Sequence, residues 1–160
     1  MNRPLLDNKL STEFLLWVNG IKCWPRTLYG PADELAARFL ELGDKAVLKD
    51  NEGSKGRLNF VVHSADEIRA ITAEYSDKHF LLQEFIPNDS DLRVLVLNGK
   101  PVLVIRRTSG GATHLNNTSQ GGRAELLPLE SVDPRILDVS VKAARLAKLE
   151  VAGVDIVIDK

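Results

Sequence analysis

The dipeptide Asn98-Gly99 constrains the fold more than any other feature of this 160-residue sequence. It separates two apolar segments, LRVLVL (92–97) and PVLVIRR (101–107). Both central residues of a type I′ turn require positive φ, a requirement that Asn-Gly meets well, so the two segments are predicted to form an antiparallel β-hairpin. Because such a hairpin does not belong to a doubly wound parallel sheet, the sequence favours an α+β fold.

The other segments alternate between predicted helices and predicted strands. Apolar periodicity, helix-starting prolines and a Ser64-x-x-Glu67 capping box predict helices over 7–19, 31–43, 64–76 and 134–150. Apolar runs predict strands over 45–49, 57–63, 79–86 and 151–159. Irregular structure is expected over 21–31 and 108–122. We expect these elements to form two small α+β lobes, residues 1–79 and residues 80–160.

The composition restricts the classes of protein to consider. With 21 basic and 22 acidic residues, the formal net charge of −1 favours neither nucleic acid nor a membrane surface as a partner. No apolar run reaches the roughly 18 residues that a membrane helix needs, and no signal-peptide pattern is present. The single cysteine, Cys23, excludes an intrachain disulfide and a cysteine-based zinc site. A cytoplasmic protein is therefore expected, and its oligomeric state is not indicated.

The loop Gly53-Ser54-Lys55-Gly56 is the first candidate site. Glycines let consecutive backbone N–H groups turn toward one point, where they hold an anion. The loop lacks the GxxxxGK[ST] pattern and leads into a strand, so it is not a Walker A loop. It is instead expected to lie over phosphates as a flap, with Lys49 supplying a point charge. The alternative is an ordinary hairpin turn.

The segment Gln83-Glu84-Phe85-Ile86, where a strand enters a linker, is the second candidate. Extended backbone offers N–H and C=O groups to the edge of adenine, while apolar side chains cover the faces of the ring. The alternative is a core strand with one polar residue at its end.

Charged residues at the strand ends of the hairpin form a third candidate. A two-residue turn at Asn98-Gly99 places Asp91 opposite Arg106, with Arg93 on the same face and Arg107 on the other. Arginines at a strand end suit phosphate or carboxylate. The alternative is a cross-strand ion pair at the surface.

Two further features are polar residues in unusual surroundings. Asn116 and Asn117 precede a Gly-Gly pair in a polar loop, which either lines a site or is a mobile surface loop. Asp155 interrupts the apolar strand 151–159, where we expect burial, and a buried carboxylate needs a cation. Magnesium is one such cation, and an arginine is the alternative.

Taken together and in this order, these segments resemble the ATP-grasp superfamily, and specifically the RimK-type α-L-glutamate ligases. The likeness extends along nearly the whole chain. The matching motifs are Asn8-Lys9-Leu10, Gly20-Ile21 with Pro25-x-Thr27, Val47-Leu48-Lys49 with Gly53-Ser54-Lys55-Gly56, Gln83-Glu84-Phe85-Ile86, Asp91-Leu92-Arg93, Ile105-x-Arg107, Asn117-x-x-x-Gly121-Gly122 and Ala152-Gly153-Val154-Asp155-Ile156. The resemblance implies the ATP-grasp fold, two α+β lobes with antiparallel sheets.

The resemblance also implies a role for each matching residue. Phosphate contacts come from the two lysines Lys9 and Lys49, adenine contacts from Glu84 and Phe85, and a ribose contact from Asp91. The full ATP-binding set is Lys9, Lys49, Gly53, Ser54, Lys55, Gly56, Gln83, Glu84, Phe85, Ile86, Asp91 and Asn116. The implied catalytic residues are Arg93, Arg107 and Asn117, and the implied Mg²⁺ ligand is Asp155. The Ile105-x-Arg107 motif favours Arg107 over Arg106 beside Asp91, which requires a β-bulge in the hairpin.

The sequence departs from the family pattern in three places. The family's Glu-x-Asn metal pair, downstream of the aspartate, has no counterpart before Lys160. Leu115 stands where a basic residue is usual, and the separate N-terminal domain of full-length ligases is absent. We therefore expect a chain truncated at both ends, with an incomplete C-terminal lobe.

The resemblance implies an ATP-dependent carboxylate–amine ligase that acts through an acyl phosphate. Its partners would be ATP, Mg²⁺, a carboxylate substrate and an amine acceptor, which is an amino acid, a peptide or a protein terminus. Because metal ligands are missing, turnover by this chain is left open. The alternative is a non-catalytic nucleotide-binding or partner-binding module that retains the fold; a phosphotransferase is a third, weaker hypothesis.

Overall fold

The computed structural model describes residues 6–22, 25–53, 57–108 and 123–158. The chain divides into two compact units, the first formed by residues 1–14 and 23–86 and the second by residues 15–22 and 87–160. The helix α1 (Lys9–Val18) contributes to both. The first unit extends to Ile86, beyond the expected boundary at residue 79, because the strand that follows this boundary pairs within the first sheet.

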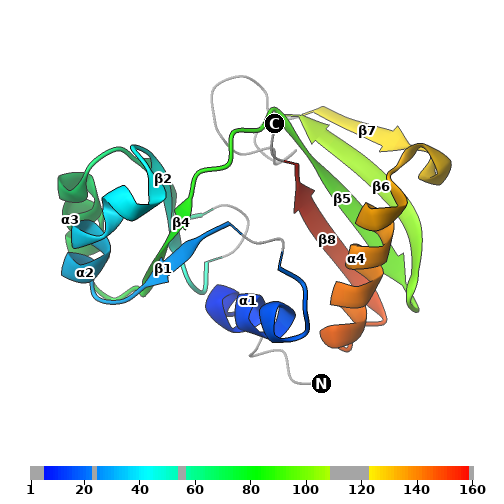
Figure 1. Ribbon diagram of the computed structural model, residues 1–160, viewed down its shortest axis with the longest axis horizontal. Coiled ribbons are helices and arrows are strands. Elements are labelled where there is room, and N and C mark those ends of the chain that lie inside the picture. The colour runs from blue at the N-terminus through cyan, green and yellow to red at the C-terminus, as the bar shows by residue number, and fades with distance from the viewer. Residues whose placement is uncertain (1–5, 23–24, 54–56, 109–122, 159–160) are drawn as a thin grey trace. The chain divides into compact units, whose positions relative to one another are not determined.

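The first unit contains a four-stranded antiparallel sheet in the order β1-β4-β2-β3. Its strands are β1 (Thr27–Tyr29), β2 (Ala46–Asp50), β3 (Asn59–Val62) and β4 (Phe80–Glu84). The helices α2 (Ala32–Ala37) and α3 (Ala65–Glu74), with a 3-10 helix over Phe39–Leu42, cover one face of this sheet (Figure 1).

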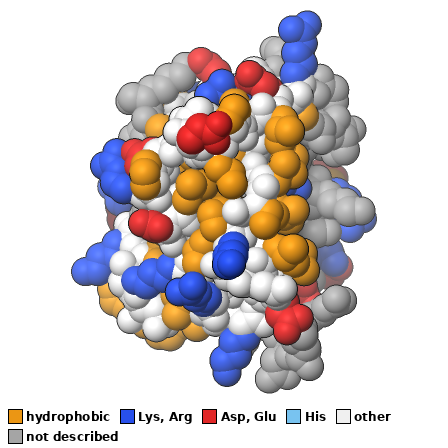
Figure 2. All heavy atoms as spheres, turned by 90° about the vertical axis from the view of Figure 1, so that its right-hand side faces the viewer, with side chains coloured by type: hydrophobic (Ala, Val, Ile, Leu, Met, Phe, Trp, Pro, Cys, Tyr) orange, Lys and Arg blue, Asp and Glu red, His pale blue; other side chains and the backbone are white. Residues whose placement is uncertain are grey.

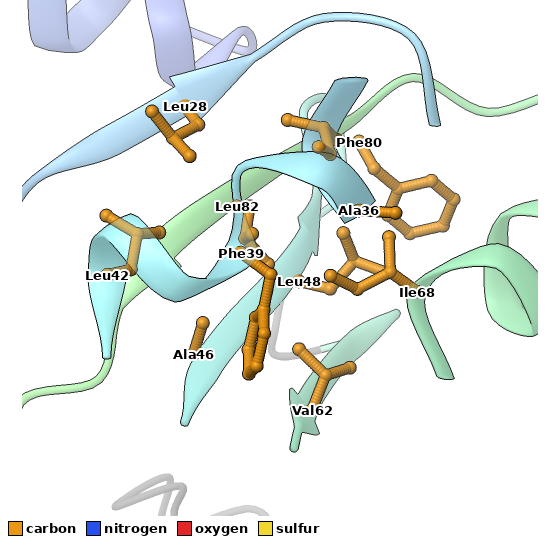
Figure 3. Packing of buried hydrophobic residues seen from close by; sticks show 11 residues of the cluster. Leu28, Ala36, Phe39, Leu42, Ala46, Leu48, Val62, Ile68, Phe80 and Leu82 are labelled. Carbon is orange, nitrogen blue, oxygen red and sulfur yellow. The ribbon is translucent and has the colours of Figure 1, made fainter. Parts of the chain in front are cut away.

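The apolar core of the first unit lies between these helices and the sheet. Leu48, Leu82 and Ile68 are fully buried, and Phe39 and Phe80 pack among them (Figure 3). Side chains alternate across a strand, so the intervening residues of β2 and β4 point to the opposite face of the sheet. That alternation places the polar residues of these strands away from the apolar core.

The second unit contains a second four-stranded antiparallel sheet, in the order β7-β6-β5-β8. Its strands are β5 (Ser90–Leu97), β6 (Lys100–Thr108), β7 (Arg123–Leu127) and β8 (Val151–Val157). A 3-10 helix over Leu129–Ser131 precedes α4 (Pro134–Leu146), which packs on one face of the sheet over Val94, Val96 and Val104. Figure 2 shows hydrophobic side chains on the right-hand side of Figure 1, and Val102 and Leu126 are among the exposed apolar residues of this unit.

The predicted hairpin is confirmed, and so is the bulge that the Arg107 motif requires. Asn98 and Gly99 both have positive φ, 48° and 72°. The register shifts between Leu95 and Val96, so Asp91 lies opposite Arg107 rather than Arg106. The simple turn geometry was therefore wrong about the facing residue, because the bulge inserts one extra position.

The strands β1 and β7 were not predicted from the sequence, and one predicted helix is interrupted. Residues expected to be irregular contain β1, and β7 follows the polar loop. The predicted helix over 31–43 becomes α2 and a 3-10 helix that ends at Gly43, where φ is 117°. The predicted helix start at Ser64 is confirmed, because its hydroxyl accepts a hydrogen bond from the backbone N–H of Glu67. None of the helices in the described ranges has the length and apolarity needed to cross a membrane.

Candidate functional site

The first unit gathers polar side chains on the sheet face opposite its apolar core. Lys49 of β2 and Gln83 of β4 point to this face, and Thr27 of β1 lies directly opposite Gln83. The helix α1 adds Lys9 and Glu13. We call these five residues the lysine cluster.

Hydrogen bonds join four members of the lysine cluster. The Nζ of Lys49 donates to Oε1 of Gln83 at 2.6 Å. The Nε2 of Gln83 donates to the Oγ1 of Thr27 at 3.0 Å and to the Oε2 of Glu13 at 3.4 Å. The Thr27 hydroxyl in turn donates to Glu13 at 3.0 Å. Since Gln83 is 4% exposed, this network gives both polar atoms of a buried amide a hydrogen-bond partner.

The lysine cluster shifts the protonation of its charged members. Burial, followed by the nearby charge of Lys9, lowers the pKa of Lys49 from 10.5 to about 8, against the opposing charge of Glu13. Burial also raises the pKa of Glu13, against its hydrogen bonds from Thr27 and Gln83 and the charge of Lys49. Both side chains are therefore closer to their neutral forms than they would be in water.

Lys9 is held by backbone carbonyls at the turn that follows β2. Its Nζ donates to the carbonyl oxygens of Asp50, at 2.6 Å, and Gly53, at 2.5 Å. Burial lowers the pKa of Lys9, and the charge of Asp50 opposes that shift. A Cβ added at Gly53 would lie 3.0 Å from the Asp50 carboxylate and 3.1 Å from the Arg57 carbonyl, so a larger residue there would need these neighbours to shift. The other residues of the predicted flap, Ser54, Lys55 and Gly56, lie outside the described residues.

The predicted adenine segment leaves the sheet after Glu84. The Glu84 carboxylate accepts from the guanidinium of Arg26 at 3.2 Å, and these hydrogen bonds lower its pKa. The ring of Phe85 lies under the ammonium of Lys45, 3.7 Å from the ring centroid. Phe85 and Ile86 follow outside any helix or strand and take no part in the pairing of the sheet.

The second unit carries a cluster of a different kind on the sheet face away from α4. Asp91 and Arg93 of β5, Arg107 of β6 and Asp155 of β8 form what we call the arginine–aspartate cluster. Arg107 donates to both carboxylate oxygens of Asp91, at 2.6 and 2.9 Å. The side chains of this pair are 7% and 12% exposed. Arg93 binds Asp155 in the same bidentate manner, at 2.7 Å for both bonds, and Arg107 also reaches Asp155 at 3.1 Å.

The expectation that Asp155 is buried was wrong. Its side chain is 45% exposed. The strand β8 is apolar in sequence, but only alternate residues such as Ala152 and Val154 turn toward the core, and Asp155 lies on the other face. An arginine partner, the alternative to a metal, is what the structure contains. By contrast, Arg106 turns away and pairs with Glu125 at 3.2 Å.

The described residues fit a metal only in part. Among them, no three His, Cys, Asp or Glu side chains are grouped to hold an ion. Asp155 offers a single carboxylate, and both of its oxygens already accept hydrogen bonds from Arg93. Mg²⁺ is commonly bound by one or two carboxylates together with substrate phosphates and water. Asp155 therefore suits an ion that phosphates largely hold, and an all-protein metal site is not formed by the described residues.

Two predicted site residues and one missed residue complete the comparison with the sequence analysis. Asn116 and Asn117 lie outside the described residues. Glu13 was missed, although it lies four positions after Lys9, a spacing that places both on one helix face.

Two cavities, of about 610 and 450 Å³, lie within the second and the first unit, and no predicted site residue lines either of them.

The sequence matches the RimK-like ATP-grasp domain family over residues 6–160. A probable α-L-glutamate ligase of Desulfotalea psychrophila is 29% identical over 159 residues, covering 96% of this chain and 33% of the relative. One from Xanthomonas campestris pv. campestris strain B100 is 31% identical over 156 residues, covering 94% of this chain and 52% of the relative. The chain thus spans between a third and about half of these relatives.

Two solved structures have a similar fold. The ATP-grasp ligase PsnB, complexed with a phosphomimetic variant of its minimal precursor, Mg and ADP, has a TM-score of 0.72 at 22% identity, covering 95% of this chain and 46% of that chain. The D-alanine–D-alanine ligase of Bacillus anthracis, complexed with ATP, has a TM-score of 0.76 at 18% identity, covering 98% of this chain and 52% of that chain. At these identities the likeness establishes the ATP-grasp fold.

Proposed function

The chain belongs to the RimK-like ATP-grasp family, and from this membership we propose that it forms the nucleotide-binding part of an ATP-dependent carboxylate–amine ligase. The observation that carries the proposal is the state of Lys49. Its ammonium is partly buried on the polar face of the first sheet, and its hydrogen-bond partner is the neutral amide of Gln83. A buried cation without a carboxylate in contact is costly, and an anionic ligand removes that cost.

Lys49 and Lys9 are proposed to contact the phosphates of ATP. Their partners are an amide oxygen and two backbone carbonyls, and among the described residues no carboxylate forms an ion pair with either lysine. Phosphate oxygens are stronger acceptors for an ammonium than neutral oxygens, because the hydrogen bond is charge-assisted. The flap residues Ser54, Lys55 and Gly56, with Gly53, are proposed to add backbone N–H groups.

The segment from Gln83 to Ile86 is proposed to hold adenine. The chain leaves the sheet after Glu84, and this departure supports the proposal, because Phe85 and Ile86 take no part in the pairing of the sheet and lie where a linker would meet the ring edge. Phe85 offers an aromatic face, over which the ammonium of Lys45 lies.

The arginine–aspartate cluster is proposed to serve the sugar and the reacting groups. Each oxygen of Asp91 has capacity beyond its bond to Arg107, so the carboxylate is able to accept from ribose. Arg93, Arg107 and Asn117 are proposed to stabilise negative charge at the reaction centre, and Asn116 to contact the nucleotide. Asp155 would hold Mg²⁺, which neutralises charge on the phosphates when it is bound.

The proposed reaction joins a carboxylate to an amine. The carboxylate oxygen takes the terminal phosphoryl group of ATP, which gives an acyl phosphate and ADP. The amine nitrogen then attacks the acyl carbon, so that an amide forms and phosphate leaves. The names of the two relatives favour glutamate as one of the amino acids that are joined.

A calorimetric titration with ATP in excess Mg²⁺ tests nucleotide binding, and phosphate release tests ligation. We expect saturable ATP binding by the parent chain and by a surface control, Lys100→Met, and strongly weakened binding by Lys49→Met. Phosphate release that requires both L-glutamate and a peptide amine supports the ligase. ATP binding without such release favours the alternative, a non-catalytic nucleotide-binding module. Absence of ATP binding contradicts both.

A further inference from the structure

We propose that Glu13 is a positioning residue for Lys49 and acts through the side-chain amide of Gln83. The inference rests on the proposed binding of ATP by the first unit and assigns a role to a residue that contacts neither lysine directly. Glu13 reaches the amide of Gln83 across a sequence separation of 70 residues, from α1 to β4.

The two ends of the Gln83 side-chain amide differ in chemistry. Its oxygen only accepts hydrogen bonds and its nitrogen only donates, so the two possible orientations present opposite chemistry to each neighbour. An ionised carboxylate is an acceptor only. Glu13 therefore selects the orientation in which Nε2 faces Glu13 and Thr27, and this orientation turns Oε1 toward Lys49.

The reversed amide would fail at both ends. Its NH₂ group would face the ammonium of Lys49, so that two donors would meet without an acceptor. Its oxygen would face the carboxylate of Glu13, so that two acceptors would meet without a donor. Because Gln83 is 4% exposed, bulk water does not compensate for either mismatch. Thr27 alone does not select the orientation, since a hydroxyl both donates and accepts.

The charges around Lys49 make Glu13 the main opposing charge. Lys9, also on α1, disfavours the ammonium, while Glu13 favours it. The neighbouring strands present uncharged groups, namely Thr27 on β1, Leu81 and Gln83 on β4, and Asn59 on β3 opposite Lys49. Asn59 has a buried Oδ1 without a hydrogen-bond partner among the described residues, so within this part of the chain the Lys49 ammonium donates to Gln83 and not to Asn59.

The consequence is a link between a carboxylate and the phosphate affinity of a lysine. When Glu13 is ionised, the Lys49 ammonium keeps its charge, and its hydrogen bond to Gln83 Oε1 holds it in one position. Without that charge, the pKa of Lys49, which is about 8, falls further, and the charged form is lost at lower pH. ATP affinity should follow, because the neutral amine offers no charge to the phosphates.

The isosteric variant Glu13→Gln tests the inference, with Glu130→Gln as a matched change at an exposed position. The first readout is the titration of Lys49, followed by NMR of ¹³Cε-labelled lysine and assigned with Lys49→Arg. We expect Glu13→Gln to lower the pKa of Lys49 and Glu130→Gln to leave it unchanged. The second readout is ATP affinity as a function of pH. At pH 8 the affinity of Glu13→Gln should be roughly tenfold weaker than that of the parent chain, and its decline with rising pH should begin at a lower pH.

An unchanged Lys49 titration in a folded Glu13→Gln protein overturns the inference. If that variant does not fold, the parent chain still decides the question, because ionisation of Glu13 should appear as a second, acidic step in the Lys49 signal. A Lys49 signal without an acidic step overturns the positioning role. Failure of the parent chain to bind ATP contradicts the proposed function instead, and the resonance titration, which needs no nucleotide, separates the two results.

Discussion

The two units hold their cations in opposite ways. In the arginine–aspartate cluster, Arg107 and Arg93 each make bidentate bonds to a carboxylate, at 2.6 to 2.9 Å. In the lysine cluster, Lys49 and Lys9 are bound by amide and carbonyl oxygens, and the carboxylate of Glu13 reaches Lys49 only through Gln83. Each cluster lies on the face of its antiparallel sheet opposite the apolar core.

This difference indicates different tasks for the two sets of charges. A buried guanidinium that is paired with a carboxylate, as Arg107 is with Asp91, supports the fold as well as any ligand, because its removal leaves a buried charge without a partner. A buried ammonium held by neutral oxygens keeps its charge for an anion, at a cost in stability that appears as a lowered pKa. The predictions that follow test this contrast.

The largest effect is expected for Arg107→Met. The substitution leaves the buried carboxylate of Asp91 without its partner, which should lower the free energy of unfolding by about 3–5 kcal/mol. Urea denaturation measures the loss. The adjacent Arg106→Met, which breaks an exposed pair with Glu125, should cost no more than about 1 kcal/mol. Equal losses in the two variants would remove the distinction between a buried and an exposed pair.

The stability of the first unit should increase as the pH rises from about 8 to 10.5. In this window the unfolded chain keeps the Lys49 proton while the folded chain releases it, so the cost of the buried charge disappears. The gain between pH 7.5 and 10, relative to Lys49→Met, should be about 2 kcal/mol. Urea denaturation of both proteins at pH 7.5 and 10 measures it. If the two proteins differ by the same free energy of unfolding at both pH values, the charge of Lys49 does not destabilise the folded chain.

Removal of Lys49 should reduce ATP affinity without unfolding the chain. A hydrogen bond to a charged group contributes about 1.5–3 kcal/mol, so Lys49→Met should weaken ATP binding by roughly 10- to 100-fold. Calorimetry measures the affinity, and urea denaturation at pH 7 should find the variant at least as stable as the parent, because a buried charge is gone. Full affinity in a folded Lys49→Met protein would exclude the proposed phosphate contact.

The smallest effect on stability is expected for Arg93→Ala. Its pair with Asp155 is about half exposed, so the unfolding free energy should change by less than about 1 kcal/mol. The carboxylate of Asp155 is then less occupied, and the Mg²⁺ concentration needed for ATP binding should fall. Asp155→Asn is the matched control and should raise that concentration. A change in the same direction in both variants would argue against Asp155 as the metal ligand.

Local rules predicted the elements whose signals lie within a few residues. The Asn98-Gly99 turn, the Ser64 cap and the Pro134 helix start are of this kind. The strand β1 has only three residues in a Pro- and Gly-containing segment, too short for a periodic signal, and its pairing with β4 is decided by the tertiary fold.

The candidate site was predicted less evenly. The motifs identified Arg107 over Arg106, which the bulge explains, but apolar neighbours wrongly suggested that Asp155 is buried. Glu13 had no recognisable motif, because its partners Thr27 and Gln83 come from the strands β1 and β4, far from the helix α1 in sequence. A contact between such distant segments follows from the register of the sheet, which no local pattern encodes.

Proton uptake on ATP binding tests the central contrast most directly. At pH 8 about half of the Lys49 side chains are neutral, and a bound phosphate should restore their charge. Calorimetric titrations with ATP in excess Mg²⁺, in buffers of different ionisation enthalpy, should therefore give an uptake of about half a proton per ATP at pH 8 and much less at pH 7. ATP binding without proton uptake at pH 8 would contradict the account, because Lys49 would then not be the charge that meets the phosphates.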